Sequence, residues 1–195
     1  MNKTRDEAWQ LVTEYVESPS LRRHCLAVET AMRAYAIQFG ASPDEWGIVG
    51  LIHDFDYERH PTADLHPQAG AEILRAWEYP EWVIRAILSH ADYLDVPRDS
   101  PMERTLYAVD ELTGFIGAVA LVRPSRAVAD VTPSAVRKKM KDKRFAQAVS
   151  REDLTRGAAE LGIEFDTHVT FVVEAMAANA EILGLAGTGR SNESA

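Results

Sequence analysis

The chain has 195 residues, of which 46% are hydrophobic and 26% are charged, and its formal net charge is −9. This composition is typical of a globular protein and excludes a collagen-like, coiled-coil or wholly disordered chain, and no apolar run reaches the roughly 18 residues of a membrane-spanning helix. The negative charge argues against a nucleic-acid-binding function, which needs many uncompensated Lys and Arg side chains. The polar N-terminus shows no secretory signal and Cys25 is the lone cysteine, so we expect a cytoplasmic protein in a reducing compartment.

The first strong helical periodicity lies between residues 21 and 39. Its apolar residues recur at steps of three, four and seven, which predicts a helix over this range. Ser18 or Ser20 is the expected N-cap, and Gly40 stands where a glycine would end the helix.

A second helix is predicted from Pro43 to about His53. Ser42 is its expected N-cap, proline suits the first helical position, and Glu45 is expected to complete a capping box with Ser42. The polar stretch 56–66 then predicts a loop.

Helical patterns continue to the end of the chain, whereas strand signals are weak. They predict helices that open at Pro67 and close at Tyr79-Pro80, and further helices over 81–91, 102–122, 134–140, 151–161 and 166–185. The expected fold class is therefore all-α.

Four histidines and two aspartates are expected to point inward from five segments of this fold. They are His24, His53, Asp54, His66, His90 and Asp110. Taken singly, a histidine on an apolar helix face is most often an ordinary core residue. Two buried carboxylates are harder to explain, because each costs several kcal/mol to bury without a partner. Divalent transition metal ions would compensate them and bind neutral imidazole. We therefore predict one or two such ions (Mn, Fe, Ni, Co or Zn).

The order of these residues resembles the HD superfamily of metal-dependent phosphohydrolases, which is named for its paired His and Asp. The similarity rests on His24, the phrase Gly50-Leu-Ile-His-Asp, the phrase that begins at His66-Pro, Ala86-Ile-Leu-Ser-His, and Asp110 in Leu106-Tyr-Ala-Val-Asp. Later phrases, such as Ala120-Leu-Val-Arg-Pro-Ser, resemble a bacterial subgroup of predicted HD-superfamily hydrolases.

The resemblance implies a fold and a domain organisation. It implies a single HD-type helical domain over residues 1–186, with a metal-binding core over about 20–123 and additional C-terminal helices over 124–186. Residues 187–195 are expected to form a flexible tail.

The resemblance also implies the roles of the ligands. His24, His53, Asp54 and Asp110 would hold one metal ion, while His66 and His90 would hold a second ion that Asp54 bridges to the first. Such a pair activates a hydroxide for attack on phosphorus. We therefore expect a phosphohydrolase acting on a small phosphorylated substrate, such as a nucleotide, with His53 and Asp54 at the catalytic centre.

Two other functions fit the same residues. One is a di-iron HD-fold oxygenase acting on a small molecule, since iron and manganese both accept this ligand set. The other is a non-catalytic module in which the metal or a ligand is only bound. A homodimer is compatible with the sequence.

Residues outside the ligand set supply further candidates. The 55–65 loop joins two ligand-bearing segments, so Arg59 is a candidate phosphate contact and His60 a candidate proton donor to the leaving oxygen. The run 137–144 contains six basic residues and one acid. It would either steer an anionic substrate or form a solvated helix face. His168 is expected to be structural.

Overall fold

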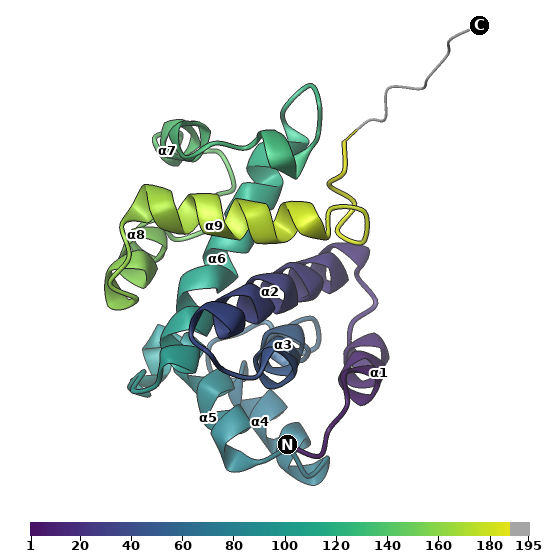
Figure 1. Cartoon of the computed structure of the whole chain (residues 1–195). Coiled ribbons are helices and arrows are strands. Elements are labelled where there is room, and N and C mark those ends of the chain that lie inside the picture. Colours follow the sequence, from purple (N-terminus) through teal and green to yellow (C-terminus); the bar gives the residue numbers. More distant parts are fainter. Residues whose placement is uncertain (188–195) are drawn as a thin grey trace, which may run out of the picture.

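A computed structural model describes residues 1–187. Within this range it contains nine α-helices, two short 3₁₀ helices and no strands, so the all-α prediction is confirmed (Figure 1). The elements are α1 (Arg5–Tyr15), α2 (Pro19–Gln38), α3 (Pro43–Ile52), α4 (Gln68–Ala76), α5 (Glu81–His90), η1 (Asp92–Leu94), α6 (Pro101–Leu121), η2 (Val128–Asp130), α7 (Pro133–Met140), α8 (Arg151–Glu160) and α9 (Phe165–Ala178).

The two longest helices, α2 and α6, organise the fold. α2 packs against α3 on one side and against α6 and α9 on others, while α6 also contacts α5, α7 and α8. Figure 1 shows α9 running alongside α2 and crossing α6. Buried apolar side chains from α1 through to Leu185 belong to one hydrophobic core cluster. The division into core and extension remains a prediction, and of the predicted tail only Gly187 lies among the described residues.

The predicted helix starts agree with the structure except in one detail. Ser18 caps α2 and Ser42 caps α3, each accepting a hydrogen bond from a backbone N–H three residues later. Gly40, with φ of +66°, follows α2 as expected. Glu45 does not complete the capping box, because its carboxylate instead accepts a hydrogen bond of 2.6 Å from the amino group of Met1.

Two helices differ from the expectation. α9 ends at Ala178 and not near residue 185, because the chain turns there and brings Leu183 and Leu185 into the core. α1 was not predicted, although Thr4 and Glu7 form a complete capping box at its start. None of the described helices is both long and apolar enough to span a bilayer.

His168 joins α9 to its neighbours. It is fully buried, its Nδ1 accepts a hydrogen bond of 2.6 Å from the Tyr35 hydroxyl, and its Nε2 donates to the Ala108 carbonyl oxygen at 3.1 Å. Both ring nitrogens are thus used in packing α9 on α2 and α6.

Candidate metal centre

Side chains that are distant in sequence converge between α2, α3, α5 and α6. They are the six that the sequence predicts as ligands: His24 of α2, His53 and Asp54 after α3, His66 before α4, His90 of α5 and Asp110 of α6. Their ligand atoms form two groups, and Asp54 belongs to both. Within each group the atoms lie within 4.8 Å of one another.

Close packing of α3 on α2 places the His-Asp doublet at this point. A Cβ at Gly50 would lie 3.0 Å from the Val28 carbonyl oxygen and 2.8 Å from Met32 Cγ, so only glycine permits this approach. α3 ends two residues later, and His53 continues in the helical conformation as its C-cap. The imidazole is therefore presented at the end of a rigid, buried helix.

The first group contains His24, His53, Asp54 and Asp110. Nε2 of His24 lies 3.0 Å from Asp110 Oδ1 and 3.3 Å from His53 Nε2. His53 Nε2 lies 3.3 Å from the same aspartate oxygen, and Asp54 Oδ2 is 3.7 Å from His24 Nε2. Ligands held at roughly 2.1 Å from one ion stand about 3 Å apart, so these spacings fit a single metal ion.

The second group contains Asp54, His66 and His90. Asp54 Oδ1 lies 3.2 Å from His66 Nε2 and 3.6 Å from His90 Nε2. The other oxygen of this carboxylate is the one nearest His24 in the first group. Asp54 is therefore positioned to bridge two ions.

Backbone carbonyls orient two of the imidazoles. Nδ1 of His53 donates to the Gly50 carbonyl oxygen at 2.8 Å, and Nδ1 of His90 donates to the Ile87 carbonyl oxygen at 2.5 Å. Because a carbonyl only accepts hydrogen bonds, Nδ1 carries a proton, and the neutral form of each imidazole would have its lone pair on Nε2, which faces the ligand groups. This is the tautomer that a metal ion at Nε2 requires.

Asp56 orients His66 and was not predicted. The carboxylate is fully buried and accepts hydrogen bonds from His66 Nδ1 at 2.9 Å and from the backbone N–H of Gly70 at 3.0 Å. A Cβ at Gly70 would stand only 2.7 Å from Asp56 Cγ, so the glycine makes room for the carboxylate. The sequence feature that could have indicated this role is the position of Asp56, an acid two residues after the His-Asp doublet and ten before His66.

The cluster is electrostatically coupled. Burial alone would raise the pKa of Asp54, but the charge of His53 and hydrogen bonds from His66 and His90 hold it well below its usual range. Burial likewise opposes protonation of His66, yet its hydrogen bonds to Asp54 and Asp56 raise its pKa to about 9. The carboxylates therefore attract positive charge into the cluster.

The donor set fits divalent transition metal ions. Asp54 and Asp110 are largely buried, with side chains 15% and 18% exposed, and within residues 1–187 no Lys or Arg side chain pairs with either. Positive charge at the cluster must then come from protons on the imidazoles or from metal ions. Imidazole nitrogens with lone pairs and two carboxylates are ligands that Mn, Fe, Co, Ni and Zn accept.

Comparison with protein families identifies the architecture around this cluster. The family model described as HD domain matches residues 21–114, a range that contains all six converging residues. The chain is a member of the HD superfamily. Comparisons with curated proteins and with solved structures gave no match. HD domains are typically metal-dependent hydrolases, while the resemblance to the bacterial subgroup stays a prediction.

A cavity of about 400 Å³ opens over both ligand groups of the HD domain. Its lining includes Tyr57, Tyr93 and Tyr107, together with Ala148 and Val149 from the segment between α7 and α8. Helices outside the matched range therefore complete the walls of the site. The volume is that of a small-molecule binding site.

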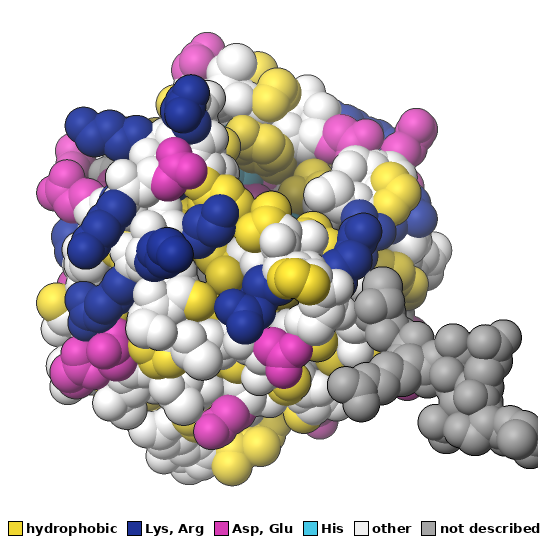
Figure 2. Space-filling model, turned by 90° about the horizontal axis from the view of Figure 1, so that it is seen from above, with side chains coloured by type: hydrophobic (Ala, Val, Ile, Leu, Met, Phe, Trp, Pro, Cys, Tyr) yellow, Lys and Arg dark blue, Asp and Glu magenta, His cyan; other side chains and the backbone are white. Residues whose placement is uncertain are grey.

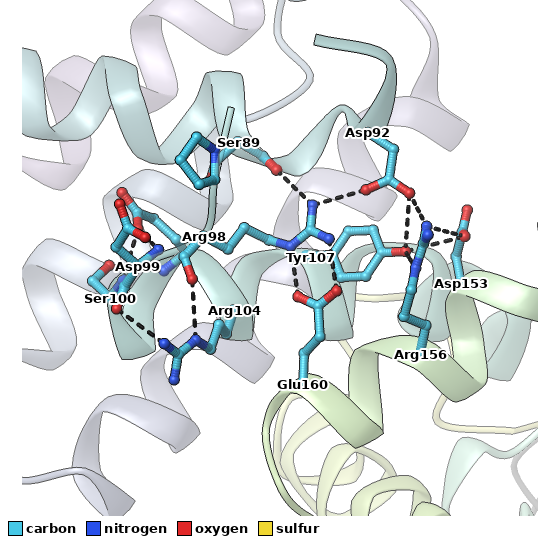
Figure 3. A network of polar contacts seen from close by, with 12 residues as sticks. Ser89, Asp92, Arg98, Asp99, Ser100, Arg104, Tyr107, Asp153, Arg156 and Glu160 are labelled. Atoms are coloured by element: carbon cyan, nitrogen blue, oxygen red, sulfur yellow. Dashed lines mark hydrogen bonds and ion pairs between the residues drawn. The ribbon is translucent and has the colours of Figure 1, made fainter. Parts of the chain in front are cut away.

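Arg98 reinforces one wall of this cavity (Figure 3). Its guanidinium donates to both carboxylate oxygens of Glu160 at 2.7 Å and to Asp92 at 2.8 Å. It also lies 3.7 Å from the centre of the Tyr107 ring. These contacts join the segment after α5 to α6 and α8.

Arg156 of α8 neutralises the acids of the same wall (Figure 3). It pairs with Asp92, donates to Asp153 at 2.7 Å, and donates to the Tyr107 hydroxyl oxygen at 2.6 Å. Glu111 also lines the cavity and has no hydrogen-bond or ion-pair partner among residues 1–187. Burial and the charge of Asp110 raise the pKa of Glu111 to about 8.

Replacing Arg98 by Leu is expected to lower the free energy of unfolding by about 2–4 kcal/mol, because the partly buried Glu160 carboxylate loses its ion-pair partner and Asp92 keeps only Arg156. Urea denaturation measures this change. Arg75→Leu is the matched control: it removes an exposed pair with Glu72 and Glu81, whose loss should be much smaller because water screens it. Equal losses in the two variants would contradict the role given to Arg98.

Neither Arg59 nor His60 reaches the cavity, whereas Tyr57 of the same loop lines it. The Arg59 guanidinium lies 4.2 Å from the centre of the Tyr15 ring and donates to the Glu14 carbonyl oxygen, so it packs on α1. His60 does not line the cavity either. The structure thus brings the six predicted ligands together but gives no support to catalytic roles for Arg59 and His60.

The basic run 137–144 lies outside the lining of the cavity. Figure 2 looks onto the end of the molecule where α7 lies and shows Lys and Arg side chains gathered on that face. Arg137 pairs with Glu164 and Asp166, and no residue of the run lines the cavity. The solvated helix face that the sequence allowed is the better description of Arg137.

Proposed function

We propose that this protein hydrolyses a phosphate ester of a small soluble substrate, using two divalent metal ions. The observation that carries the proposal is Asp54, which belongs to both ligand groups beneath one cavity: its Oδ2 lies 3.7 Å from His24 Nε2, and its Oδ1 lies 3.2 Å from His66 Nε2 and 3.6 Å from His53 Nε2. Paired ions of this kind lower the pKa of water and neutralise charge on phosphoryl oxygens.

Six side chains of the protein would bind the two metal ions. His24, His53, Asp54 and Asp110 would bind one ion, and Asp54, His66 and His90 the other. Among the residues that line the cavity within 1–187, none is Lys or Arg. Binding of an anionic phosphate would therefore depend on the metal ions more than on the side chains, and activity should be strictly metal-dependent.

The cavity also supports the choice of a small substrate. Tyr93 lies at its wall and donates to the His66 carbonyl oxygen at 2.6 Å, and the Tyr57 ring meets His66 edge to face at 5.1 Å. These aromatic rings flank the second ligand group at the wall of the cavity. A substrate that fits between them would be held close to both ions.

The test begins with elemental analysis of protein purified without added metal. The protein is then stripped with a chelator, reloaded with each ion separately, and assayed for phosphate release from a panel of phosphoesters. We expect no activity in the stripped protein and recovery with at least one ion. Phosphate release that persists in demonstrably metal-free protein would refute the mechanism.

The same preparation separates the alternative functions. Two irons per chain, oxygen uptake on a small-molecule panel and no phosphate release would favour a di-iron oxygenase. If removing the metal only lowers the melting temperature and no substrate turns over, a non-catalytic module would be favoured.

A further inference from the structure

A second cavity, of about 220 Å³, lies beside the metal centre between α2 and α6. Its walls are mostly apolar, and the segment after α9 closes one side. Its lining residues on the two helices include Ala27, Gly117, Ala118 and Leu121, and Met176, Leu183 and Leu185 complete it.

Small residues on α6 create this space. A Cβ built at Gly117 would meet nothing closer than Leu185 Cδ1, at 3.8 Å, which is ordinary van der Waals contact. The neighbouring Ala118 and the facing Ala27 of α2 are also small. The cavity can therefore be narrowed by substitution at Gly117 without forcing the backbone apart.

The two cavities share a wall. His24 and Gly114 line both of them, and successive turns of α6 carry the lining from Asp110 and Gly114 to Gly117. Nε2 of His24 faces the first ligand group, while its Nδ1 would lie 3.7 Å from a Cβ at Gly114. The two cavities are therefore adjacent, with His24 and Gly114 at the boundary between them.

His24 differs from the other histidines of the cluster at this junction. Nδ1 of His53, His66 and His90 each donates to an acceptor of the protein, whereas Nδ1 of His24 has no hydrogen-bond partner among the described residues. With a metal ion bound at Nε2, Nδ1 would carry the proton and could donate to an oxygen of a ligand that crosses the junction.

The lining specifies the chemistry of the ligand. Thr113 lines the second cavity, but its hydroxyl already donates to the Asp110 carbonyl oxygen at 2.9 Å. Ser20 and Arg23 are exposed at the rim. The interior therefore offers few groups to pair with the polar edge of a nucleobase, and it favours a hydrocarbon group.

We infer that the second cavity is a substrate subsite for an aliphatic group, so that the substrate is an alkyl phosphoester whose phosphate lies at the metal centre. This inference rests on the proposed function for the position of the phosphate. It narrows the substrate class away from nucleotides, because burial of apolar surface and not hydrogen bonding would supply the selectivity.

Binding of non-hydrolysable phosphonates to the metal-loaded protein tests the subsite independently of turnover. Calorimetry would compare methylphosphonate with hexylphosphonate. Each buried methylene is worth about a fourfold gain in affinity, and hexylphosphonate has five more methylenes than methylphosphonate, so we expect it to bind on the order of 10³-fold more tightly. Equal affinities, or no binding of either phosphonate, would overturn the inference.

Gly117→Leu locates the effect in this cavity. It should lower the affinity for hexylphosphonate at least tenfold more than that for methylphosphonate, and Gly117→Ala should do so by less. Ala178→Leu, at the exposed end of α9, is the control. It should leave the ratio of the hexylphosphonate affinity to the methylphosphonate affinity as in the unmodified protein. A ratio that Gly117→Leu does not change would place the alkyl group elsewhere and overturn the inference. Tight hexylphosphonate binding without phosphate release from any ester would instead refute only the proposed function.

Discussion

Replacing Asp54 by Asn is expected to abolish hydrolysis and to disturb both metal sites at once. Among residues 1–187, Asp54 alone belongs to both ligand groups and is the one acid of the second group. We expect the second ion to be lost, the first to bind more weakly, and phosphate release to fall on the order of 10³-fold or more, since each ion supplies several kcal/mol of transition-state stabilisation. Elemental analysis and the phosphoester assay on the same preparation measure these changes.

Variants of the unshared ligands make this prediction specific. His90→Ala should remove only the second ion, and Asp110→Asn should weaken only the first. Asp64→Asn is a control in the exposed loop before α4 and should change neither metal content nor activity. If Asp54→Asn kept two ions per chain, the carboxylate would not be the bridge between the sites.

The ligands could be predicted because the sequence pattern around them indicates which of these side chains point into the core. His24 and His90 share helix faces with apolar residues, and burying Asp110 on such a face requires compensation. The resemblance of the surrounding sequence phrases to the HD superfamily then assigned these residues to two metal ions. The structure brings these residues together without any adjustment of the predicted ligand set.

Residues in turns were harder to predict. Arg59 and Asp56 lie in the same polar stretch, yet the first packs on Tyr15 and the second is fully buried against His66. Helical periodicity gives the direction of a side chain only where the backbone is helical. In a turn that direction depends on contacts with distant segments, here α1 and Gly70 of α4.

The end of α9 was missed for a related reason. The residues after Ala178 keep the apolar character of a helix, but Leu183 and Leu185 are buried only if the chain turns back on itself. Tertiary packing overrides local propensity at this point. The same turn supplies one side of the proposed aliphatic subsite.

Replacing Asp56 by Asn is expected to weaken the second metal site selectively, although Asp56 belongs to neither ligand group. The amide can accept from only one of the two donors that now face the carboxylate, His66 Nδ1 and the Gly70 N–H. Loss of such an outer partner typically costs 10–100-fold in metal affinity. Titration of the metal-stripped protein with one kind of metal ion should therefore show weaker binding at the second site and unchanged binding at the first.

The comparison with His66→Ala separates orientation from ligation. His66→Ala should lose the second ion outright, whereas Asp56→Asn should regain it when the metal concentration is raised about 100-fold, and activity should return with it. Asp56→Ala should be worse than Asp56→Asn, because it leaves both buried donors without an acceptor. If Asp56→Asn bound two ions with unchanged affinity, the buried carboxylate would serve only to hold the turn against α4, and the histidine would owe its position to packing alone.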